Sequence, residues 1–576
     1  MRKVMWIGLL AVLVIAVVAV AGCSGGTTTT TAGGTATTAA GPETTGGQTV
    51  STGGPATSAA GQPVIGGVAK IAVMSSPAKF GVPADVVGPD QWFEGFFLES
   101  MMYSTDKADQ YIPALATSWD LSADKTSYTF HLRQGVKFTD GTDFNAQACK
   151  FCWDLNLPPA GGTPTTAAAA TTTTAAAAAG PPPSAGPPPD FAFVKSIEVV
   201  DNYTVKVNVK YWSNQELTLI SRKSWAVFSP TAYQQMGKDK MDSNPVGTGP
   251  FMLKSYTPNQ EMVLVKNPTY WMKDDAGQQL PYLDGIDVMI FKDPTSMLVA
   301  VQSGQVDGAD HISMTGAQQL QSNSSYALEH FGGPVDAIEM NTADPNSVWS
   351  NVQMRQALEY AIDKEGIAKS VGLGFTPAVY TITHSITDVV DPGTTPRKYD
   401  PAKAKQLMAA AGHTSVDLTI SFNSTETDPA LVTAIQANLA AVGINAKINA
   451  MPQAAFAPIS VKPPTGNDLI LNGERGGSPD ILDGLVEMFG KGTIYFPGAK
   501  FPDQFYTLLD QAQQVPTIAD TYPVCVQMEK LAYDDATIVP VVMEDFISVS
   551  GPHLKNMEWN FANLPGPWWQ SAWLSK

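Results

Sequence analysis

Cysteine and histidine are scarce in this 576-residue chain, which has four cysteines and six histidines. The histidines lack the spacing of metal ligands, and the chain contains no HExxH motif. Its one GxSxG match, GCSGG at 22–26, directly follows a long apolar run and is not a nucleophile elbow between a strand and a helix. Cationic residues are also few, with 35 Lys and Arg against 53 Asp and Glu, a formal net charge of −18. Because phosphate binding needs a cationic surface, we expect no nucleic-acid partner. An extracellular hydrolase remains an alternative, since the paired carboxylates of glycosidases leave no sequence signature.

The N-terminus has the order of a secretory signal, with Arg2 and Lys3 followed by an apolar run from Val4 to Ala21. The next residues, Val20-Ala21-Gly22-Cys23, resemble the bacterial lipobox. This resemblance implies a lipoprotein signal peptide over 1–22 and lipidation of Cys23, which anchors the mature chain to the cell membrane. Cleavage removes two cations and no acid, so the mature charge is 33 − 53 = −20.

Two segments have compositions that do not form a core. Residues 24–64 are almost entirely Gly, Thr, Ala, Ser, Pro and Gln, which predicts a disordered tether over 23–64 that begins at the lipidated Cys23. A flexible coil of about 40 residues reaches roughly 35 Å, enough to hold a globule clear of a bilayer. Residues 158–189, rich in Pro, Ala and Thr, are expected to form a disordered surface insertion.

Three cysteines remain after Cys23, so at most one disulfide can form and one thiol is left over. Cys149 and Cys152 form a CxxC in a segment that reads as a helix, and no further metal ligands lie nearby. Packing is therefore favoured over zinc binding or redox chemistry, and the state of Cys525 stays open. The face expected to pack comprises Ala148, Phe151, Cys152 and Leu155.

The rest of the chain alternates strands and helices with clear start and stop signals. Three helices are each expected to begin with an Asp cap and a Pro, and to end at a Gly. These triplets are Asp293-Pro294 with Gly304, Asp400-Pro401 with Gly412, and Asp428-Pro429 with Gly443. The strand–helix–strand order predicts an α/β fold of parallel sheets, with ligands bound at the carboxyl ends of the strands.

Several segments together resemble one family, the extracytoplasmic solute-binding proteins of peptide-type ABC importers, which include oligopeptide, dipeptide and nickel binders. The segments that carry the resemblance are PALATSWDLSADKTSYTFHLRQGVKFTDGTDFNAQ, NPVGTGPFMLKSYTPNQEMVLVKNPTYW, VQMRQALEYAIDKEGIAKSVGLG, YDPAKAKQLMAAAG and IVPVVMEDFISVSG. The second predicts a hairpin that turns at Pro258-Asn259, and the third a helix with a core face of Met354, Leu358, Ala361 and Ile362.

The resemblance implies a two-lobed periplasmic-binding-protein fold of type II with an inserted domain and a hinge. It assigns 65–110, 215–337 and 539–576 to lobe one, 111–214 to the inserted domain and 338–538 to lobe two. It implies a non-enzymatic function without cofactor or metal: lobe closure captures a peptide-like or other small polar solute outside the cytoplasm. The expected partners are that ligand and an ABC permease with cytoplasmic ATPase subunits, and the protein is expected to be a monomer. A peptide-capturing chaperone or sensor on the same fold is a further alternative.

The stretch NGERGGSPD, residues 472–480, is the main candidate for ligand recognition. It follows a short apolar strand, Asp468 to Leu471, and should be an exposed loop. In peptide binders of the resembled family, an Asp in the corresponding loop pairs with the peptide ammonium. Here Arg475 or Glu474 takes that place, with Asn472 and Ser478 beside them.

These two charged residues predict opposite ligands. Glu474 in the cleft suits a cationic amine, whereas Arg475 suits a carboxylate or phosphate. If the two pair with each other, the site is neutral and suits an oligosaccharide. We favour the alignment in which Arg475 faces the cleft. The alternatives, in which Glu474 faces the cleft or the two residues pair with each other, stay open.

Other candidates come from the ends of predicted strands. SSPAKFG brings Ser75, Ser76, Lys79 and Phe80 to such an end, and Asn423 follows the strand DLTISF. Each is as well explained by turn chemistry. The C-terminal tryptophans could stack on sugars, but core packing is favoured for them. These are Trp568, Trp569 and Trp573.

Overall fold

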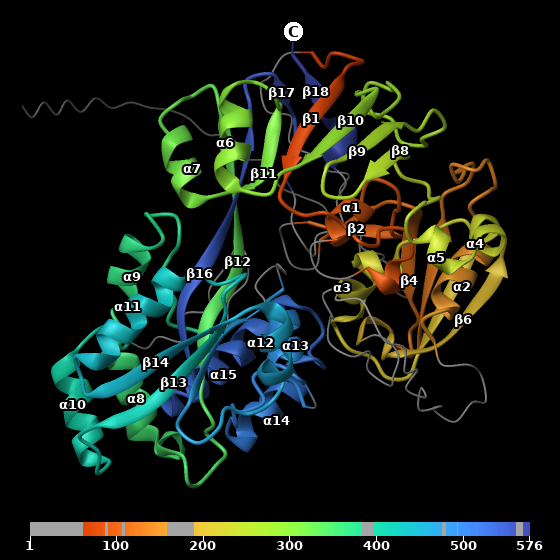
Figure 1. The fold of residues 1–576 in the computed structure, drawn as a ribbon. Helices are drawn as coiled ribbons and strands as arrows, with labels where there is room; N and C mark the ends of the chain where they lie inside the picture. Colours follow the sequence, from red (N-terminus) through yellow and green to blue (C-terminus); the bar gives the residue numbers. More distant parts are fainter. Residues whose placement is uncertain are drawn as a thin grey trace, which may run out of the picture. The chain divides into compact units, whose positions relative to one another are not determined.

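The computed structural model (Figure 1) describes residues 62–86, 90–105, 110–157, 189–382, 395–474, 480–491, 493–559 and 568–575. These ranges all belong to one compact unit, Gly54–Lys576. The predicted signal peptide, the lipidation site Cys23 and almost all of the tether and of the 158–189 insertion lie outside the described residues.

A ten-stranded sheet forms the centre of the fold, in the order β14-β13-β15-β12-β16-β11-β1-β10-β9-β8. Its strands are β1 Val68–Val73, β8 Phe251–Thr257, β9 Glu261–Lys266, β10 Gly285–Ile290, β11 Gly308–Ile312, β12 Ala327–Glu339, β13 Val416–Asn423, β14 Ile444–Met451, β15 Leu469–Glu474 and β16 Ile538–Ser550. Strand β1 is parallel to β10 and β11, and β13 is parallel to β14 and β15. The central pair β12·β16 is antiparallel, as are its outer contacts with β15 and β11. The prediction of parallel sheets was therefore only partly right: the sheet is mixed and continuous.

Hydrophobic side chains divide this sheet into two lobes. We call β1 and β8–β11 with their core lobe one, and β13–β15 with α8–α15 lobe two. Strands β12 and β16 serve both: Ile547 and Val549 of β16 pack in a lobe-one cluster, and Val539 and Val541 pack in a lobe-two cluster. The long strands can be followed in Figure 1 from one half of the sheet to the other.

The lobe-one helix α6 Pro294–Gln302 packs against β1 and β11, and α7 Met314–Leu320 packs beside it. The other helices of this part of the chain are α1 Gln91–Glu94, α2 Ala146–Asp154, α3 Glu216–Ser221, α4 Pro230–Met236 and α5 Lys238–Met241. In lobe two the helices are α8 Val352–Ala361, α9 Lys364–Ser370, α10 Pro401–Ala410, α11 Pro429–Ala440, α12 Gln453–Ser460, α13 Ile481–Phe489, α14 Asp503–Ala512 and α15 Tyr522–Asp535. Within the described ranges, no helix combines the length and apolar character needed to cross a membrane.

The predicted helix starts are confirmed. The carboxylates of Asp293, Asp400 and Asp428 each accept a backbone hydrogen bond at the start of α6, α10 and α11, and each helix has proline in its first turn. The predicted stops, Gly304, Gly412 and Gly443, all have positive φ angles. The predicted core face of α8 is also confirmed, because Met354, Leu358, Ala361 and Ile362 are all buried.

A separate four-stranded antiparallel sheet has the order β4-β5-β7-β6 and falls within the predicted inserted domain. Its strands are β4 Ala116–Leu121, β5 Ser127–Leu132, β6 Val194–Asp201 and β7 Thr204–Val209. The core of this sheet is continuous with that of lobe one. Two small pairings complete the described strands, β2 Met102–Ser104 with β3 Tyr111–Pro113 and β17 Leu554–Lys555 with β18 Trp573–Leu574.

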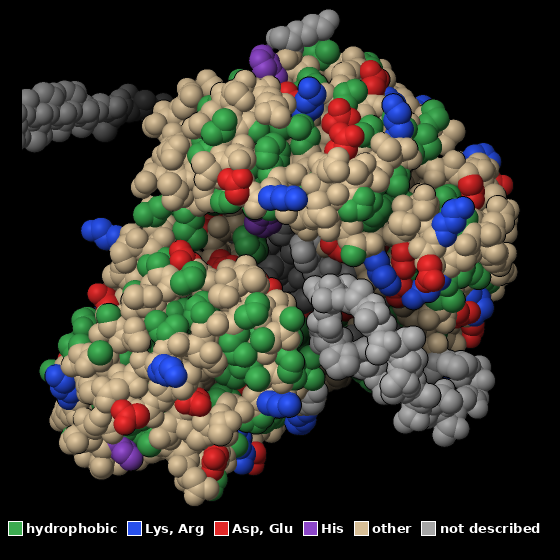
Figure 2. All heavy atoms as spheres, viewed as in Figure 1, with side chains coloured by type: hydrophobic (Ala, Val, Ile, Leu, Met, Phe, Trp, Pro, Cys, Tyr) green, Lys and Arg blue, Asp and Glu red, His purple; other side chains and the backbone are tan. Residues whose placement is uncertain are grey.

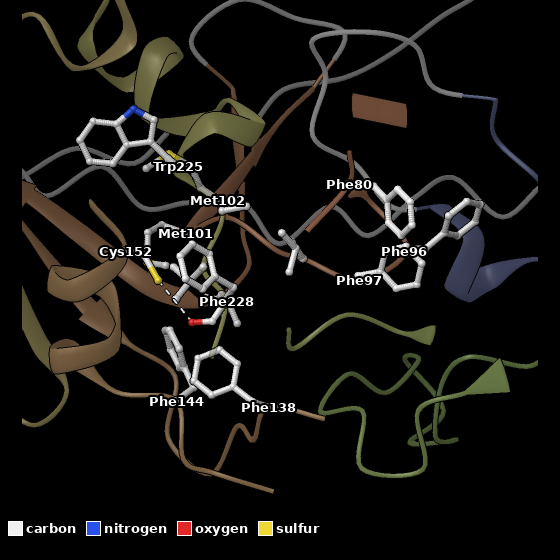
Figure 3. Close-up of a cluster of buried hydrophobic side chains, with 14 of the residues drawn as sticks. Phe80, Phe96, Phe97, Met101, Met102, Phe138, Phe144, Cys152, Trp225 and Phe228 are labelled. Atoms are coloured by element: carbon white, nitrogen blue, oxygen red, sulfur yellow. Dashed lines mark hydrogen bonds between the residues drawn. The ribbon is translucent and has the colours of Figure 1, made fainter. Parts of the chain in front are cut away.

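The CxxC lies on α2 and is packed in this shared core. Cys149 and Cys152 are free and buried, and the Cys152 thiol donates a hydrogen bond to the Phe228 carbonyl at 3.3 Å (Figure 3). Leu155, which the sequence placed on the buried face, is 47% exposed, whereas Trp153 is fully buried. The prediction of packing is supported, but the buried face is turned toward Cys149 and Trp153 and away from Leu155.

The predicted hairpin is present as β8 and β9, with Asn259 at a positive φ in its turn. The segment before it packs closely on lobe one, because a side chain at Gly249 would come within 2.7 Å of the Phe96 carbonyl. Of the C-terminal tryptophans, Trp569 and Trp573 are buried, as core packing predicts. The surroundings of the Trp568 side chain lie outside what the structure describes.

Candidate functional site

Among the strands that the structure describes, only β12 and β16 are shared by the two lobes. They pair from Ala327 with Ser550 to Glu339 with Ile538. Strand β11 of lobe one adds to β16 at residues 547–550, and β15 of lobe two adds to β12 at residues 335–339. Between these flanked ends the register shifts at Gly332–Val335. Such a bulge interrupts the ladder and bends the strand, which makes this position suited to a hinge.

Gly333 lies inside the bulge, and no larger residue fits there without movement. A Cβ atom at Gly333 would lie 3.0 Å from the Glu544 carbonyl oxygen and 3.0 Å from a ring carbon of Phe546. Glu544, Asp545 and Phe546 face this point from β16 and are only partly buried. The bulge therefore combines close backbone packing with side chains that remain open to solvent.

Carboxylates gather beside the bulge. Asp336 of β12 is 4% exposed, and its pKa is raised to about 7 by burial and by Asp428, against a lowering hydrogen bond to Thr427. The pKa of Glu544 is raised to about 8 by burial, by Asp336 and by Glu426. Within the described residues, no lysine or arginine is among the groups that shift the pKa of Asp336 or Glu544. A ligand cation placed here would stabilise their charged forms.

His311 completes this group from the end of β11. It has a φ of +53°, unusual for a residue with a side chain, and its Nδ1 lies 2.9 Å from Asp310 Oδ2. Asp310 is held in turn by the Ser548 hydroxyl, which donates to Oδ1 at 2.7 Å. The imidazole meets the Phe546 ring edge-on at 4.5 Å, and it lowers the pKa of Glu544. We call Asp336, Glu426, Asp428, Glu544 and His311 the hinge group.

The stretch at 472–480, the main candidate from the sequence, begins as a strand and not as the predicted loop. Asn472 and Glu474 were expected in a loop, but β15 continues to Glu474, so both lie in the sheet. Asn472 pairs with Ala337 and Glu474 with Val335, which brings the strand end beside the bulge. The extension occurs because β12 runs alongside and provides backbone partners for residues 472–474. Arg475 and Ser478 lie outside the described residues, as does the side chain of Glu474.

Asn423 follows β13 as predicted, but its amide is used locally. Its Oδ1 accepts hydrogen bonds from the backbone and hydroxyl of Thr425, and its Nδ2 donates to Gln453 Oε1 at 2.6 Å. The side chain is 3% exposed. These contacts form a local turn, and this turn leads to Glu426 and Asp428 of the hinge group.

The candidates after β1 are placed in three different settings. The hydroxyls of Ser76 and Tyr256 are 2.8 Å apart, and Ser76 lines a surface cavity of about 780 Å³ that Tyr256 and Asn259 also line. Lys79 forms ion pairs with Asp85 at 3.2 Å and Asp242 at 3.4 Å. Phe80 has no exposed surface. Figure 3 shows Phe80 among buried aromatic side chains, so its ring supports the core and is not open to a ligand.

Sequence reasoning missed Asp336, Glu544 and His311. A signal was present: an acid interrupts the apolar strand segments PVDAIEM and VPVVMEDF. A charged residue within a buried strand is uncommon and marks either a paired charge or a site. On the face shown in Figure 2, acidic and basic side chains are interspersed, and no large patch of one sign forms. Among the described residues, no cluster of three or more His, Cys, Asp or Glu is arranged to hold a metal ion.

Comparison with known proteins agrees with this architecture. The family described as "Bacterial extracellular solute-binding proteins, family 5 Middle" matches residues 110–496. The glutathione-binding protein GsiB of Shigella flexneri serotype 5b is 26% identical over 469 residues, covering 79% of this chain and 84% of GsiB.

Solved structures share the fold at lower identity. DppA of Helicobacter pylori, in complex with the peptide STSA, superposes with a TM-score of 0.71 at 22% identity, covering 89% of this chain and 99% of DppA. NikA of Brucella suis, in complex with Fe(III)-EDTA, gives 0.70 at 21% identity, covering 87% and 99%. The chain therefore belongs to the bacterial extracellular solute-binding proteins, family 5: it is a non-enzymatic solute-binding protein of an ABC importer.

Proposed function

We propose that the two lobes close about the β12·β16 bulge to capture an extracellular solute, which the protein delivers to an ABC permease. The observation that carries this proposal is that, among the described strands, the two separately packed halves share a single pair, β12·β16. One of the register shifts in this pair, at Gly332–Val335, lies between the stretches that β11 and β15 flank. Rotation there changes few backbone dihedrals and leaves both cores intact.

We further propose that the solute carries an ammonium group and is peptide-like. The hinge group places carboxylates at the point of closure. Within the described residues, no lysine or arginine is among the groups that shift the pKa of Asp336 or of Glu544. An ammonium bound there gains charge-assisted hydrogen bonds and offsets the burial of the carboxylates. Relatives named for glutathione and a related fold holding a peptide support this class of ligand. Glu474 facing the cleft would also suit an ammonium, whereas Arg475 inward would favour a carboxylate or phosphate instead.

The remaining parts of the proposal concern location. Lipidation of Cys23 would anchor the mature chain to the outer surface of the membrane, and residues 24–64 would let the globule reach the permease. The partners are the permease with its cytoplasmic ATPase subunits. The binding protein acts as a monomer.

Peptide binding by the soluble domain, residues 65–576, tests the proposal. Native mass spectrometry first identifies any co-purified ligand. Isothermal titration then compares trialanine, its N-acetylated form and glutathione. We expect binding of a free-amine compound, with affinity lost on acetylation and reduced at least tenfold in Asp336→Asn and Glu544→Gln, because each substitution removes a charged acceptor. Asp275→Asn, at an exposed acid elsewhere, is the matched control and should bind as the wild type does.

The other outcomes are equally informative. Arg475→Ala separates the ligand classes: loss of a co-purified anion in this variant would overturn the ammonium proposal and place Arg475 in the site. A bound oligosaccharide would favour a neutral site in which Glu474 and Arg475 pair. Hydrolysis of a labelled peptide or glycan would contradict capture itself.

A further inference from the structure

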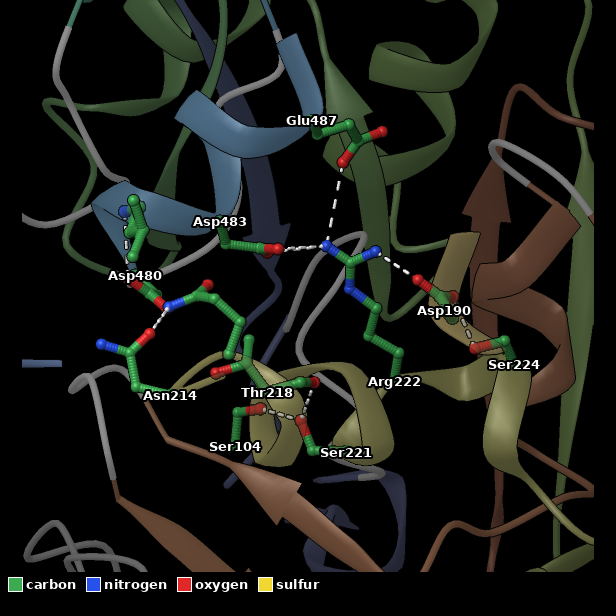
Figure 4. A network of polar contacts seen from close by, with 12 residues as sticks. Ser104, Asp190, Asn214, Thr218, Ser221, Arg222, Ser224, Asp480, Asp483 and Glu487 are labelled. Carbon is green, nitrogen blue, oxygen red and sulfur yellow. Dashed lines mark hydrogen bonds and ion pairs between the residues drawn. The ribbon is translucent and has the colours of Figure 1, made fainter. Parts of the chain in front are cut away.

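The two lobes also meet at a second place, away from β12 and β16. There the segment that contains Asn214 and Arg222, on the lobe-one side, contacts α13 of lobe two (Figure 4). The same segment contacts the end of α14 and the residues that follow it. Asn214 and Arg222 flank α3, whose core residue Ile220 packs in the lobe-one cluster. Leu482 and Leu485 of α13 pack in a lobe-two cluster. The contacts between them therefore join two independent cores.

Arg222 is at the centre of this contact. Its Nη2 lies 2.6 and 2.7 Å from the two carboxylate oxygens of Asp483 on α13, and its Nη1 lies 2.6 Å from Asp190 Oδ1 on its own side. Glu487, one turn further along α13, is 3.8 Å away. The side chains of Arg222 and Asp483 are 16% and 8% exposed, so solvent screens the pair only in part.

At this contact one guanidinium faces three carboxylates. Asp483 and Glu487 belong to lobe two, and Asp190 belongs to the lobe-one side. Burial lowers the pKa of Arg222, but Asp483, Asp190 and Glu487 together raise it well above its usual range, so the cation is permanent. Without this cation the two faces would present like charges to each other and repel.

Uncharged contacts extend the same interface. The Asn214 side chain donates to the carbonyls of Ala512 at 2.9 Å and Val515 at 3.2 Å, and its backbone N–H donates to Gln513. Gln514 Nε2 donates back to the Trp212 carbonyl at 3.0 Å. These bonds fix the orientation in which Arg222 meets Asp483, and they break if the lobes separate.

We propose that Arg222 is a charge latch: by bridging Asp190 to Asp483 and Glu487, it holds the lobes together and sets how readily the protein opens. This goes beyond solute capture, because the latch biases the lobes whether or not a ligand is bound. If the latch favours the state in which the lobes are in contact, ligand binding has to supply less free energy for closure. The same bias slows the release of a bound ligand. The latch is independent of the hinge group, since none of its residues lies on β12 or β16.

Distances between spin labels test the latch without any ligand. Labels are attached at Lys254→Cys on β8 and Lys405→Cys on α10, both exposed, while the native thiols are buried. Pulsed electron spin resonance on the ligand-free soluble domain then reports the lobe-to-lobe distance distribution. In the otherwise wild-type protein we expect a dominant joined population. Asp483→Asn should lower the ratio of joined to separated molecules about tenfold, as expected for the loss of one partly buried bidentate charge pair.

Arg222→Met should shift the distribution further than Asp483→Asn, because it removes the guanidinium from Asp483, Asp190 and Glu487 together. Adding Asp483→Asn to Arg222→Met should bring part of the joined population back by relieving the repulsion. Asp510→Asn breaks the exposed Lys491–Asp510 pair on neighbouring elements and should change nothing. Circular dichroism confirms that each variant is folded. Identical distributions in the wild type, Asp483→Asn and Arg222→Met would overturn the latch.

Discussion

Glu99 provides a sharp test of how lobe one is held together. This carboxylate is 1% exposed and accepts four side-chain hydrogen bonds. The donors are Thr248 Oγ1 at 2.7 Å, Trp271 Nε1 at 2.8 Å, Tyr270 Oη at 2.9 Å and Tyr103 Oη at 3.2 Å. Three of them belong to the segment around the β8–β9 hairpin, so Glu99 ties that segment to the core.

Glu99→Ala leaves all four donors without their acceptor. A buried donor left unpaired costs about 1 to 3 kcal/mol, and water entering the space vacated by the side chain keeps each cost near the lower value. Four donors at about 1 kcal/mol each give a loss of about 4 kcal/mol. At an unfolding entropy of about 2.1 cal/mol/K per residue, a unit as large as Gly54–Lys576 would show a fall in Tm of about 4 °C.

Glu99→Gln should be much milder for a specific reason. The Gln carbonyl can keep the bonds from Thr248 and from the indole of Trp271, which can only donate. The hydroxyls of Tyr103 and Tyr270 can rotate and accept from the new amide. We expect a loss of about 1 to 2 kcal/mol, from weaker neutral bonds replacing charged ones. Calorimetry on both variants is the assay. Equal Tm values for Glu99→Ala and Glu99→Gln, or a fall below about 2 °C for Glu99→Ala, would refute the reasoning.

Three further predictions concern stability, reactivity and a helix cap. Burial raises the pKa of Glu339 to about 8. The contribution of this carboxyl to stability is therefore present below its unfolded pKa of 4.5 and is lost as pH rises toward 8. Glu339→Gln should match the wild-type Tm at pH 4 and exceed it at pH 9, and a Tm difference that stays constant over this range would contradict the assignment. Burial raises the pKa of all three described thiols, that of Cys525 to about 12. Ellman's reagent should therefore react with none of them in the native soluble domain and with all three after denaturation. Rapid labelling of the native protein would be inconsistent with this packing. Asp400 caps α10 through the Lys403 N–H; Asp400→Ala should cost about 1 kcal/mol in urea unfolding, Asp400→Asn much less, and equal losses would argue against the cap.

Local structure followed closely from the sequence because its signals act over a few residues. Asp400, Pro401 and Gly412 mark the ends of α10 through chemistry within one helical turn, and the structure has each in its expected role. The α/β class followed from the order of such elements. The extent of β15 did not, since a strand continues for as long as a neighbouring strand offers partners, and β12 is 130 residues away in the chain.

The candidate site was predicted less well, for a related reason. The hinge group draws His311 and Asp336 from two consecutive strands, β11 and β12, and Glu544 from β16, which is separated from them in sequence by α8–α15. No spacing rule relates them, and only their unusual place in apolar strands marks them. Phe80 shows the opposite failure: it follows a strand end as predicted, but the chain turns its ring into the core.

Strand β16 has a consequence for how the protein is made. It lies between β11 and β12, supplies Ile547 and Val549 to one core and Val539 and Val541 to the other, and comes near the end of the chain. A polypeptide synthesised from its N-terminus can therefore complete neither lobe until this late strand is available. The topology thus delays stable folding of either lobe until residues 538–550 have been synthesised.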